Sequence, residues 1–318
     1  MLAFDAAQVH RLLDYPGLIA ALRAAHAAQA MPRTETLLVE EPPAETAENK
    51  FLSLVSWMAG AEIAVKLVGV FPGNLARKVP EPSVQGLVAL FSGQTGAPLL
   101  VADGAAMTFR KTAADSGLGA SFLARADVRT LLVVGAGGLA PHVAQAHKAA
   151  RPSLERVLIW NRSPARARQT AAALDLPGTS VGVAADLDAA VAQADIISCV
   201  TMATAPLVKG ALLRPGTHLD LIGAYLPHMR EADDEAARRA QIFVDTRRGC
   251  EGSGDLGGPL AAGLITLADI RADLFALCAG RHPGRIDDSA ITLYKNVGGA
   301  HLDLFTARHL LARAGTTA

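Results

Sequence analysis

The 318-residue sequence predicts an α/β fold in which a doubly wound parallel sheet is joined to an α+β domain. From residue 129 to residue 245, short apolar runs alternate with helical patterns, which is typical of parallel strands connected by helices. From residue 34 to residue 103, strand-like runs follow one another with only turns between them, which is typical of an antiparallel sheet. The chain is long enough for two such domains.

The N-terminal region is expected to begin with helices and continue as strands. Apolar side chains recur at helical spacing over residues 5–30, where Asp5 can cap the start and Pro16 should divide the segment into two helices. Residues 92–96 have the composition of a hairpin turn. The predicted strands are residues 36–39, 51–57, 61–71, 86–91 and 98–103.

In the second half of the chain, the predicted strands are residues 130–135, 156–161, 179–183, 196–200, 218–224 and 242–245. Helices are expected from residue 141, over 165–174 and over 187–192. A helix over residues 107–125 should connect the domains, and a last helix over residues 292–314 should return to the first one. We therefore expect one domain of residues 1–112 plus 296–318 and another of residues 113–295.

Composition excludes several classes of protein. The 30 basic residues balance the 30 acidic ones, so no basic surface for nucleic acid is predicted. No apolar segment reaches the ~18 residues that span a bilayer, and no basic stretch precedes an apolar run at the N-terminus. The three cysteines lack C-x-x-C spacing, which suits a reducing compartment. The sequence predicts a cytoplasmic protein that binds neither nucleic acid nor membranes.

A glycine loop, G-A-G-G-L-A at residues 135–140, follows an apolar strand and precedes a helix. Gly135 permits the tight turn, and Gly137 lets the backbone approach a pyrophosphate. Together with Gly138 and Leu139, these residues would place the pyrophosphate on the free N–H groups of the helix N-terminus. The loop therefore predicts a Rossmann dinucleotide-binding site.

The end of the second strand in this domain indicates which nicotinamide cofactor is bound. An acidic residue there would bind the ribose 2′-hydroxyl, whereas basic residues accommodate a 2′-phosphate. The sequence has Asn161 and Arg162 at this point and no carboxylate, so NADP(H) is favoured and NAD(H) remains possible. Arg166 and Arg168 could either contact the phosphate or lie on a solvated helix face.

Ten short stretches of the chain match one family in order. They are residues 32–34, 66–68, 71–74, 103–104, 112–114, 135–140, 200–204, 222–224 (with Pro227 and Glu231 beyond), 244–246 and 295–298. On these stretches the chain resembles the ornithine cyclodeaminase/mu-crystallin family over essentially its whole length.

The resemblance implies a substrate domain, a Rossmann domain and a homodimer formed through the substrate domains. It also implies a site in the cleft between domains, where the nicotinamide faces a small amino or imino acid. Further cofactor contacts implied by the resemblance are Thr112, Thr201, Met202, Ala203, Ile222 and Val297. The implied substrate-binding residues are Arg33, Lys66, Arg110, Lys111, Tyr225 and Gly298.

Lys66 is the candidate catalytic residue. It lies within the apolar run A-V-K-L-V, where an uncompensated ammonium group would be costly to bury. The alternative is a lysine on the solvated face of that strand. Arg33 suits carboxylate binding because its planar guanidinium can pair with both carboxylate oxygens.

Two departures from the family pattern favour one branch. Cyclodeaminases typically have Arg where this chain has Lys111, and an Asp acid/base where it has Tyr225. A phenol with a reference pKa of about 10 is a poor base near neutral pH, whereas reduction of a preformed imine needs only one hydride and one proton. The resemblance is therefore to reductases of Δ1-pyrroline-2-carboxylate and Δ1-piperideine-2-carboxylate.

Other functions stay open at this point. They are ornithine cyclodeaminase, alanine dehydrogenase of the same family, reduction of an opine-type imine, and a non-catalytic NADP(H)-binding protein similar to mu-crystallin. The proton donor could be Lys66, Tyr225 or a water molecule. His142 and His147 are expected on a helix surface and His228 in a surface loop, and no metal site is predicted.

Overall fold

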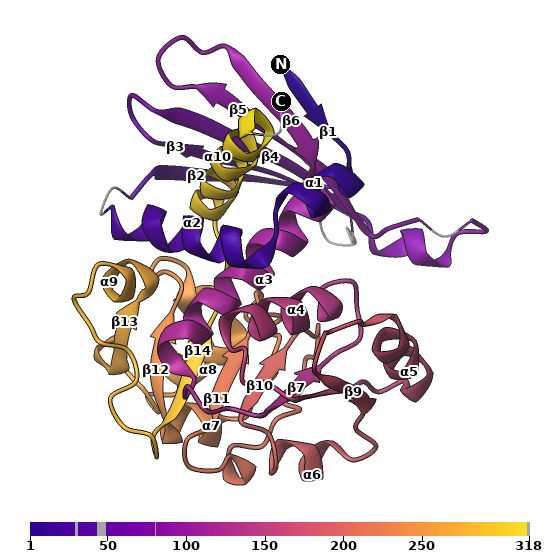
Figure 1. Ribbon diagram of the computed structural model, residues 1–318, viewed down its shortest axis with the longest axis vertical. Coiled ribbons are helices and arrows are strands. Elements are labelled where there is room, and N and C mark those ends of the chain that lie inside the picture. The colour runs from indigo at the N-terminus through magenta and orange to yellow at the C-terminus, as the bar shows by residue number, and fades with distance from the viewer. Residues whose placement is uncertain (29–30, 43–48, 80, 317–318) are drawn as a thin grey trace. The chain divides into compact units, whose positions relative to one another are not determined.

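The computed structural model describes residues 1–28, 31–42, 49–79 and 81–316, and it divides into two compact units (Figure 1). Unit 1 comprises Met1–Ala25, Gln29–Lys111 and Gly299–Ala318, and unit 2 comprises His26–Ala28 and Thr112–Gly298. The end of the helix expected over residues 5–30 lies outside the described residues. Among the described residues, no helix is both long and apolar enough to cross a bilayer.

Unit 1 contains a six-stranded sheet with the order β1-β6-β5-β4-β3-β2. Neighbouring strands are antiparallel except β1 and β6, which are parallel. All five predicted strands are confirmed, including the hairpin between β5 and β6, whereas the three-residue β1 was not predicted. The strands are β1 (Leu2–Phe4), β2 (Arg33–Glu40), β3 (Lys50–Trp57), β4 (Glu62–Val70), β5 (Val84–Ser92) and β6 (Pro98–Asp103).

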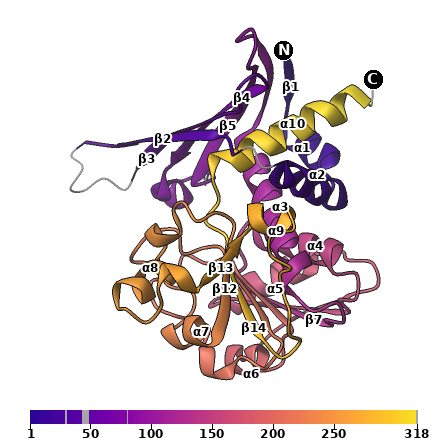
Figure 2. The same ribbon diagram turned by 90° about the vertical axis from the view of Figure 1, so that its left-hand side faces the viewer.

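Unit 1 contains the helices α1 (Ala6–Leu12), α2 (Tyr15–Ala27) and α10 (Ala300–Thr316), together with the first part of α3 (Gly104–Leu123), up to Lys111. The Asp5 carboxylate accepts a hydrogen bond from the Gln8 backbone N–H, which confirms the predicted cap of α1. Pro16 lies in the first turn of α2, so the predicted division into two helices is also confirmed. Helix α10 packs along β3, β4 and β5 (Figure 2), and a 3₁₀ turn, η1 (Pro72–Ala76), follows β4.

The two faces of the unit 1 sheet differ in burial. Along β4, Ala64, Lys66 and Val68 are buried, whereas the alternating residues Ile63 and Val65 are only half-buried. Because successive side chains of a strand point to opposite faces, one face is covered by α10 and the other is left open. Lys66 therefore belongs to the covered face.

Unit 2 contains an eight-stranded, wholly parallel sheet with the order β13-β12-β14-β11-β10-β7-β8-β9, which confirms the predicted doubly wound fold. The order reverses between β7 and β10, and ligands of such sheets bind beyond the carboxyl ends of the strands at this switch point. The strands are β7 (Thr130–Val134), β8 (Arg156–Trp160), β9 (Ser180–Val183), β10 (Ile196–Cys199), β11 (His218–Leu221), β12 (Ala240–Val244), β13 (Ile270–Asp273) and β14 (Ile291–Lys295).

The core of unit 2 lies between this sheet and its helices. On one face, apolar strand residues such as Leu132, Ile197 and Leu219 pack against Val191 and Ala236 from two of the helices. The helices of this half of the chain are α3 (Gly104–Leu123), α4 (Ala140–Ala150), α5 (Pro164–Ala173), α6 (Leu187–Val191), α7 (Asp234–Arg239), α8 (Gly254–Ala261) and α9 (Leu274–Cys278). The short 3₁₀ turns are η2 (Gly210–Leu212), η3 (Cys250–Gly252) and η4 (Leu267–Asp269).

The single helix expected over residues 292–314 is wrong in its first part. Ile291–Lys295 forms β14, which pairs in parallel with β11 and β12, and α10 begins only at Ala300. Every residue of β14 is buried, because the strand lies inside the sheet. The run I-T-L-Y-K mixes apolar and polar residues over only five positions, so its pattern does not distinguish a buried strand from a helix.

His147 is also placed differently from the expectation. It lies on the inner side of α4 and is completely buried, with its Nε2 3.1 Å from an Asp220 carboxylate oxygen. Asp220 also accepts hydrogen bonds from the hydroxyl groups of Ser198 (2.7 Å) and Ser116 (2.9 Å). The histidine is therefore part of a buried polar network rather than a surface residue.

Candidate active site

The glycine loop of unit 2 has the geometry that pyrophosphate binding requires. Gly135 has a φ of 119°, and a Cβ atom there would lie 2.8 Å from the carbonyl oxygen of Val200. At Gly137 no atom lies within 4 Å of an added Cβ, so the backbone is open to a ligand. Leu139 precedes α4 and gives it no side-chain cap. The Ala140 N–H donates to the Gly137 carbonyl oxygen (3.0 Å), so the loop turns tightly into the helix. These residues fit a dinucleotide.

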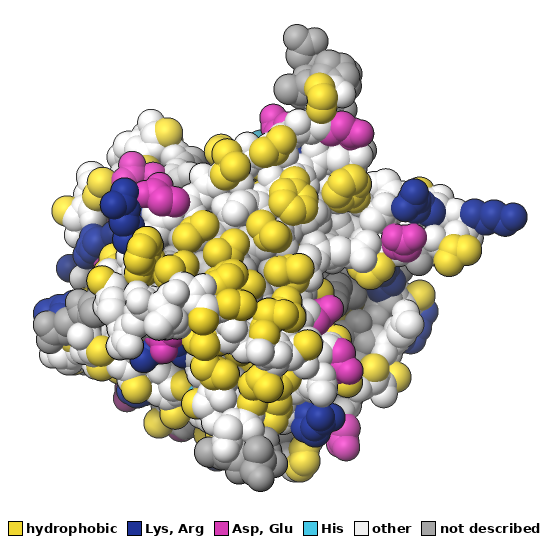
Figure 3. All heavy atoms as spheres, turned by 90° about the horizontal axis from the view of Figure 1, so that it is seen from above, with side chains coloured by type: hydrophobic (Ala, Val, Ile, Leu, Met, Phe, Trp, Pro, Cys, Tyr) yellow, Lys and Arg dark blue, Asp and Glu magenta, His cyan; other side chains and the backbone are white. Residues whose placement is uncertain are grey.

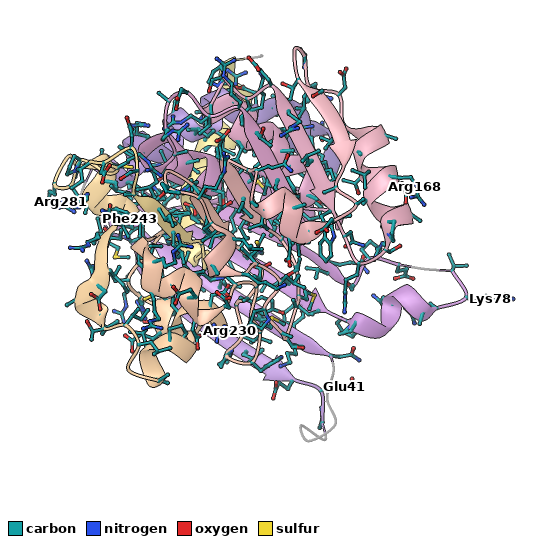
Figure 4. All side chains as sticks on the ribbon, turned by 90° about the horizontal axis from the view of Figure 1, so that it is seen from below. Glu41, Lys78, Arg168, Arg230, Phe243 and Arg281 are labelled. Atoms are coloured by element: carbon teal, nitrogen blue, oxygen red, sulfur yellow. The ribbon has the colours of Figure 1, made fainter. Side chains whose placement is uncertain are left out.

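The end of β8 is basic. Asn161 is half-buried and donates a hydrogen bond to the carbonyl oxygen of Ser163 (3.2 Å). Arg162 is exposed, and within the described part of the chain it forms no ion pair. Arg166 and Arg168 are exposed on α5, and Arg168 points away from the helix into solvent (Figure 4). Arg162 is therefore available to an anionic ligand.

A buried carboxylate holds the loops that follow β10 and β11. One oxygen of Glu231 accepts hydrogen bonds from the Thr201 backbone N–H (2.6 Å) and hydroxyl (2.8 Å). The other oxygen accepts one from the Gly223 N–H (2.6 Å). The loops touch at this point, because a Cβ atom on Gly223 would lie 1.8 Å from the Thr201 carbonyl oxygen. Beside them, Met202 is exposed and Ile222 is buried.

A second buried carboxylate, Asp245, holds the loop after β14. It accepts hydrogen bonds from the N–H groups of Val297 (3.0 Å) and Gly298 (2.6 Å), and Gly298 has a positive φ of 74°. Burial raises the pKa of Asp245, and burial together with the negative charge of Asp255 raises the pKa of Glu231. Both carboxyl groups are therefore structural acceptors that fix the backbone at the carboxyl edge of the sheet.

A buried ion pair, Lys295 to Asp255, contacts the backbone of both Glu231 and Asp245, and the Lys295 carbonyl oxygen accepts a hydrogen bond from the Asp245 N–H (3.1 Å). Asp255 accepts a hydrogen bond from the Glu231 N–H (2.8 Å), and its other oxygen lies 3.2 Å from the Lys295 ammonium group. Both side chains of this pair are essentially inaccessible to solvent. Nearby, the Thr112 carbonyl oxygen accepts a hydrogen bond from the Asn296 amide. Among the residues that the structure describes, no group of His, Cys, Asp or Glu could hold a metal ion.

Unit 1 contains a buried pair of lysines. Lys66 on β4 and Lys111 on α3 are 7% and 4% exposed, and both face Asp303 on α10. The Lys111 ammonium lies 2.5 Å from the Asp303 carboxylate, whereas that of Lys66 lies 3.9 Å away and donates a hydrogen bond to the Thr108 hydroxyl (2.7 Å). Burial lowers the pKa of Lys66 to about 8, although Asp303 opposes this shift.

The structure does not place the predicted substrate-binding arginines, Arg33 and Arg110, beside the two buried lysines. Arg33 is exposed beside Glu35 (3.5 Å), and its register with Trp57 places it on the open face of the sheet, opposite Lys66. The Arg110 guanidinium donates hydrogen bonds to His10 and lies over the ring of Tyr15. In unit 2, Tyr225 is 49% exposed, and its backbone N–H donates to the carbonyl oxygen of Gly223.

Sequence reasoning missed the acidic members of these clusters. A lysine in an apolar strand signals that a counter-ion must lie nearby, but nothing local identifies Asp303 among 30 acidic residues. Glu231 and Asp245 were noted only in stretches that match the family, and Asp245 also as the end of a predicted strand.

A family model described as the ornithine cyclodeaminase/mu-crystallin family matches residues 20–317. The chain belongs to this family. It is 43% identical to the Delta(1)-pyrroline-2-carboxylate reductase of Paracoccus denitrificans (85% of this chain, 84% of the relative). It is 41% identical to Protein SAR DEFICIENT 4 of Arabidopsis thaliana (82% of each chain).

A solved structure of a related protein has the same fold as this chain. It is the Delta(1)-pyrroline-2-carboxylate reductase of Thermococcus litoralis in complex with NADH and L-proline, with a TM-score of 0.91 and 28% identity. The match covers 100% of this chain and 98% of the other. The Rossmann-like α/β fold expected from the sequence is thereby confirmed.

Proposed function

We propose that the protein is an NAD(P)H-dependent reductase of cyclic ketimines. It would convert Δ1-pyrroline-2-carboxylate to L-proline and Δ1-piperideine-2-carboxylate to L-pipecolate. The observation that carries this proposal is the buried cluster of two ammonium groups, Lys66 and Lys111, around one carboxylate, Asp303. With both lysines protonated, one positive charge is uncompensated, and a substrate carboxylate can neutralise it. The named functions of the relatives support the same reaction.

In this proposal, the two lysines have different roles. Lys111 binds the substrate carboxylate, and Lys66 protonates the imine nitrogen, since a pKa of about 8 allows proton donation near neutral pH. When bound, the reduced nicotinamide supplies the hydride that C2 of the imine accepts. Arg33, Arg110, Tyr225 and Gly298 remain proposed substrate contacts. Both arginines would have to leave their present positions, Arg33 beside Glu35 on the open face and Arg110 against His10.

The cofactor would be held by residues of unit 2. The glycine loop would bind the pyrophosphate, and the loops fixed by Glu231 and Asp245 would line the nicotinamide side. NADP(H) is favoured over NAD(H), because Arg162 is exposed and carries no acidic partner within the described residues. The proposed contacts are Thr112, Gly135, Gly137, Gly138, Leu139, Asn161, Arg162, Thr201, Met202, Ala203, Ile222 and Val297.

Arg162→Ala is expected to weaken NADPH binding about tenfold or more and to leave NADH binding nearly unchanged. A hydrogen bond to a charged group contributes about 1.5–3 kcal/mol, and only NADPH has the 2′-phosphate. Fluorescence titration with both cofactors measures this difference. Arg168→Ala is the matched control, since that side chain points into solvent (Figure 4). Equal losses for both cofactors would contradict the proposed role of Arg162.

The reaction itself is tested by following the absorbance of the reduced nicotinamide with each imino acid. We expect oxidation of NADPH by both cyclic imines. Release of ammonia from L-ornithine with NAD would instead indicate a cyclodeaminase, and reductive amination of pyruvate would indicate an alanine dehydrogenase. Tight NADPH binding without turnover of any imine would indicate a binding protein.

A homodimer formed through unit 1 is part of the proposal. Hydrophobic side chains gather over the open face of the sheet (Figure 3). Leu37 is 63% exposed, Val39 53%, Trp57 50% and Phe51 46%. An apolar patch of this kind on a soluble protein marks an interaction surface, and a second copy presents the same apolar face.

Leu37→Asp is expected to convert the dimer into monomers, because it would bury an unpaired carboxylate in the apolar interface. Sedimentation velocity over a range of protein concentrations measures the change. Val79→Asp is the control, since Val79 is 74% exposed but lies outside the sheet. A wild-type protein that remains monomeric at all concentrations would refute this interface.

A further inference from the structure

The buried cluster of Lys66, Lys111, Thr108 and Asp303 is asymmetric. The Asp303 carboxylate is in direct contact with Lys111 at 2.5 Å and reaches Lys66 only at 3.9 Å. Lys111 has a second fixed partner, the carbonyl oxygen of Gly299 (3.3 Å). Lys66 instead donates to the Thr108 hydroxyl, whose own proton is donated to the carbonyl oxygen of Gly104 (2.6 Å). One lysine therefore has a charged partner in contact and the other a neutral one.

Few other groups act on Lys66. Its cross-strand neighbours on the same face, Leu54 on β3 and Val88 on β5, are uncharged. The charged groups that face it are Asp303 from α10 and Lys111 from α3. The attraction between opposite charges weakens with distance and is stronger in a poorly solvated interior. Asp303 therefore interacts more strongly with Lys111, at 2.5 Å, than with Lys66, at 3.9 Å.

We propose that Asp303 is a positioning residue that divides two tasks between the lysines. Its direct contact holds the Lys111 ammonium group in place for the substrate carboxylate, and its longer distance leaves Lys66 as the amine that exchanges a proton. The assignment of tasks to substrate groups rests on the proposed reduction of an imine. The unequal effect of Asp303 on the two amines does not depend on that reaction and can be measured without it.

The pKa of Lys66 provides a direct readout. Asp303 raises it and Lys111 lowers it, against the larger lowering by burial to about 8. Asp303→Asn removes the opposing negative charge and should lower the pKa of Lys66 by about 1 unit or more, as expected for the loss of a charge within 4–6 Å. Lys111→Met should raise it, because the repulsion disappears and Asp303 is released to pair with Lys66.

The experiment titrates the lysine side chains of the full chain by NMR, with and without NADPH, and assigns the Lys66 signal by its absence in Lys66→Met. The pH dependence of kcat/KM for imine reduction is recorded in parallel. The control variant is Glu62→Gln, which breaks another ion pair between β4 and α10 (Glu62 to Arg308, 3.0 Å) away from the lysines. It should leave both the titration of Lys66 and the pH profile unchanged.

We expect the pKa of Lys66 to move down in Asp303→Asn and up in Lys111→Met, with the alkaline limb of kcat/KM moving in the same directions. At a pH above the pKa of Lys66 in both the wild-type protein and Asp303→Asn, a pKa that is lower by one unit reduces kcat/KM about tenfold. An unchanged titration of Lys66 in either folded variant would overturn the proposal, even if activity fell. If the pKa of Lys66 falls in Asp303→Asn and rises in Lys111→Met but the protein reduces no imine, the unequal pairing is upheld. Only the proposed function is then refuted.

Discussion

Lys66→Met is expected to lower kcat for imine reduction by about 10²–10⁴-fold, the usual contribution of a positioned proton donor. Methionine has a similar length but carries no proton, and its thioether is easily accommodated in an apolar site. In the wild-type protein, only the protonated amine can donate, so the rate should fall as the pH rises through about 8. The residual rate of the variant should not fall in this pH range. Steady-state rates measured across pH would show the difference.

Two controls accompany this prediction. NADPH affinity should be unchanged, because all of the proposed cofactor contacts lie in the other unit. Lys78→Met replaces an exposed lysine and should retain wild-type activity. A Lys66→Met variant that keeps most of the wild-type kcat would mean that Tyr225 or a water molecule donates the proton and that Lys66 only binds the substrate.

Lys295→Met is expected to reduce the free energy of unfolding by about 3–5 kcal/mol, because it leaves the Asp255 carboxylate buried without its counter-ion. Asp255 holds the backbone at Glu231, which in turn fixes the loops at Thr201 and Gly223. We therefore also expect weaker cofactor binding. Urea denaturation and cofactor titration measure the two effects.

The double variant Lys295→Met/Asp255→Asn should recover most of the lost stability. Asparagine keeps an oxygen that can accept the Glu231 N–H but carries no charge, so no unpaired charge remains buried. Lys209→Met, which breaks the exposed pair with Asp188, should leave the stability unchanged. Wild-type stability in Lys295→Met itself would show that this buried pair does not hold the carboxyl edge of the sheet together.

Expectations based on local patterns agreed best with the structure. The period-two runs in unit 1, the strands β7 to β12 of unit 2 and the cap of α1 by Asp5 were predicted, whereas β13 was not. These features depend on neighbouring residues, so the sequence displays them directly. The expectation failed at residues 291–295, where the short mixed run I-T-L-Y-K becomes the buried strand β14 because β11 and β12 lie on either side of it.

The sequence by itself determined the glycine loop, the basic end of the second strand and the presence of a lysine in an apolar strand. Only the tertiary structure decided what surrounds that lysine. It placed Asp303 and Lys111 against Lys66, and it put Arg33 on the opposite face of the sheet. The physical reason is that charges act through space. The partner of a buried ammonium group is set by the packing of β4, α3 and α10, and no local pattern in the sequence records that packing.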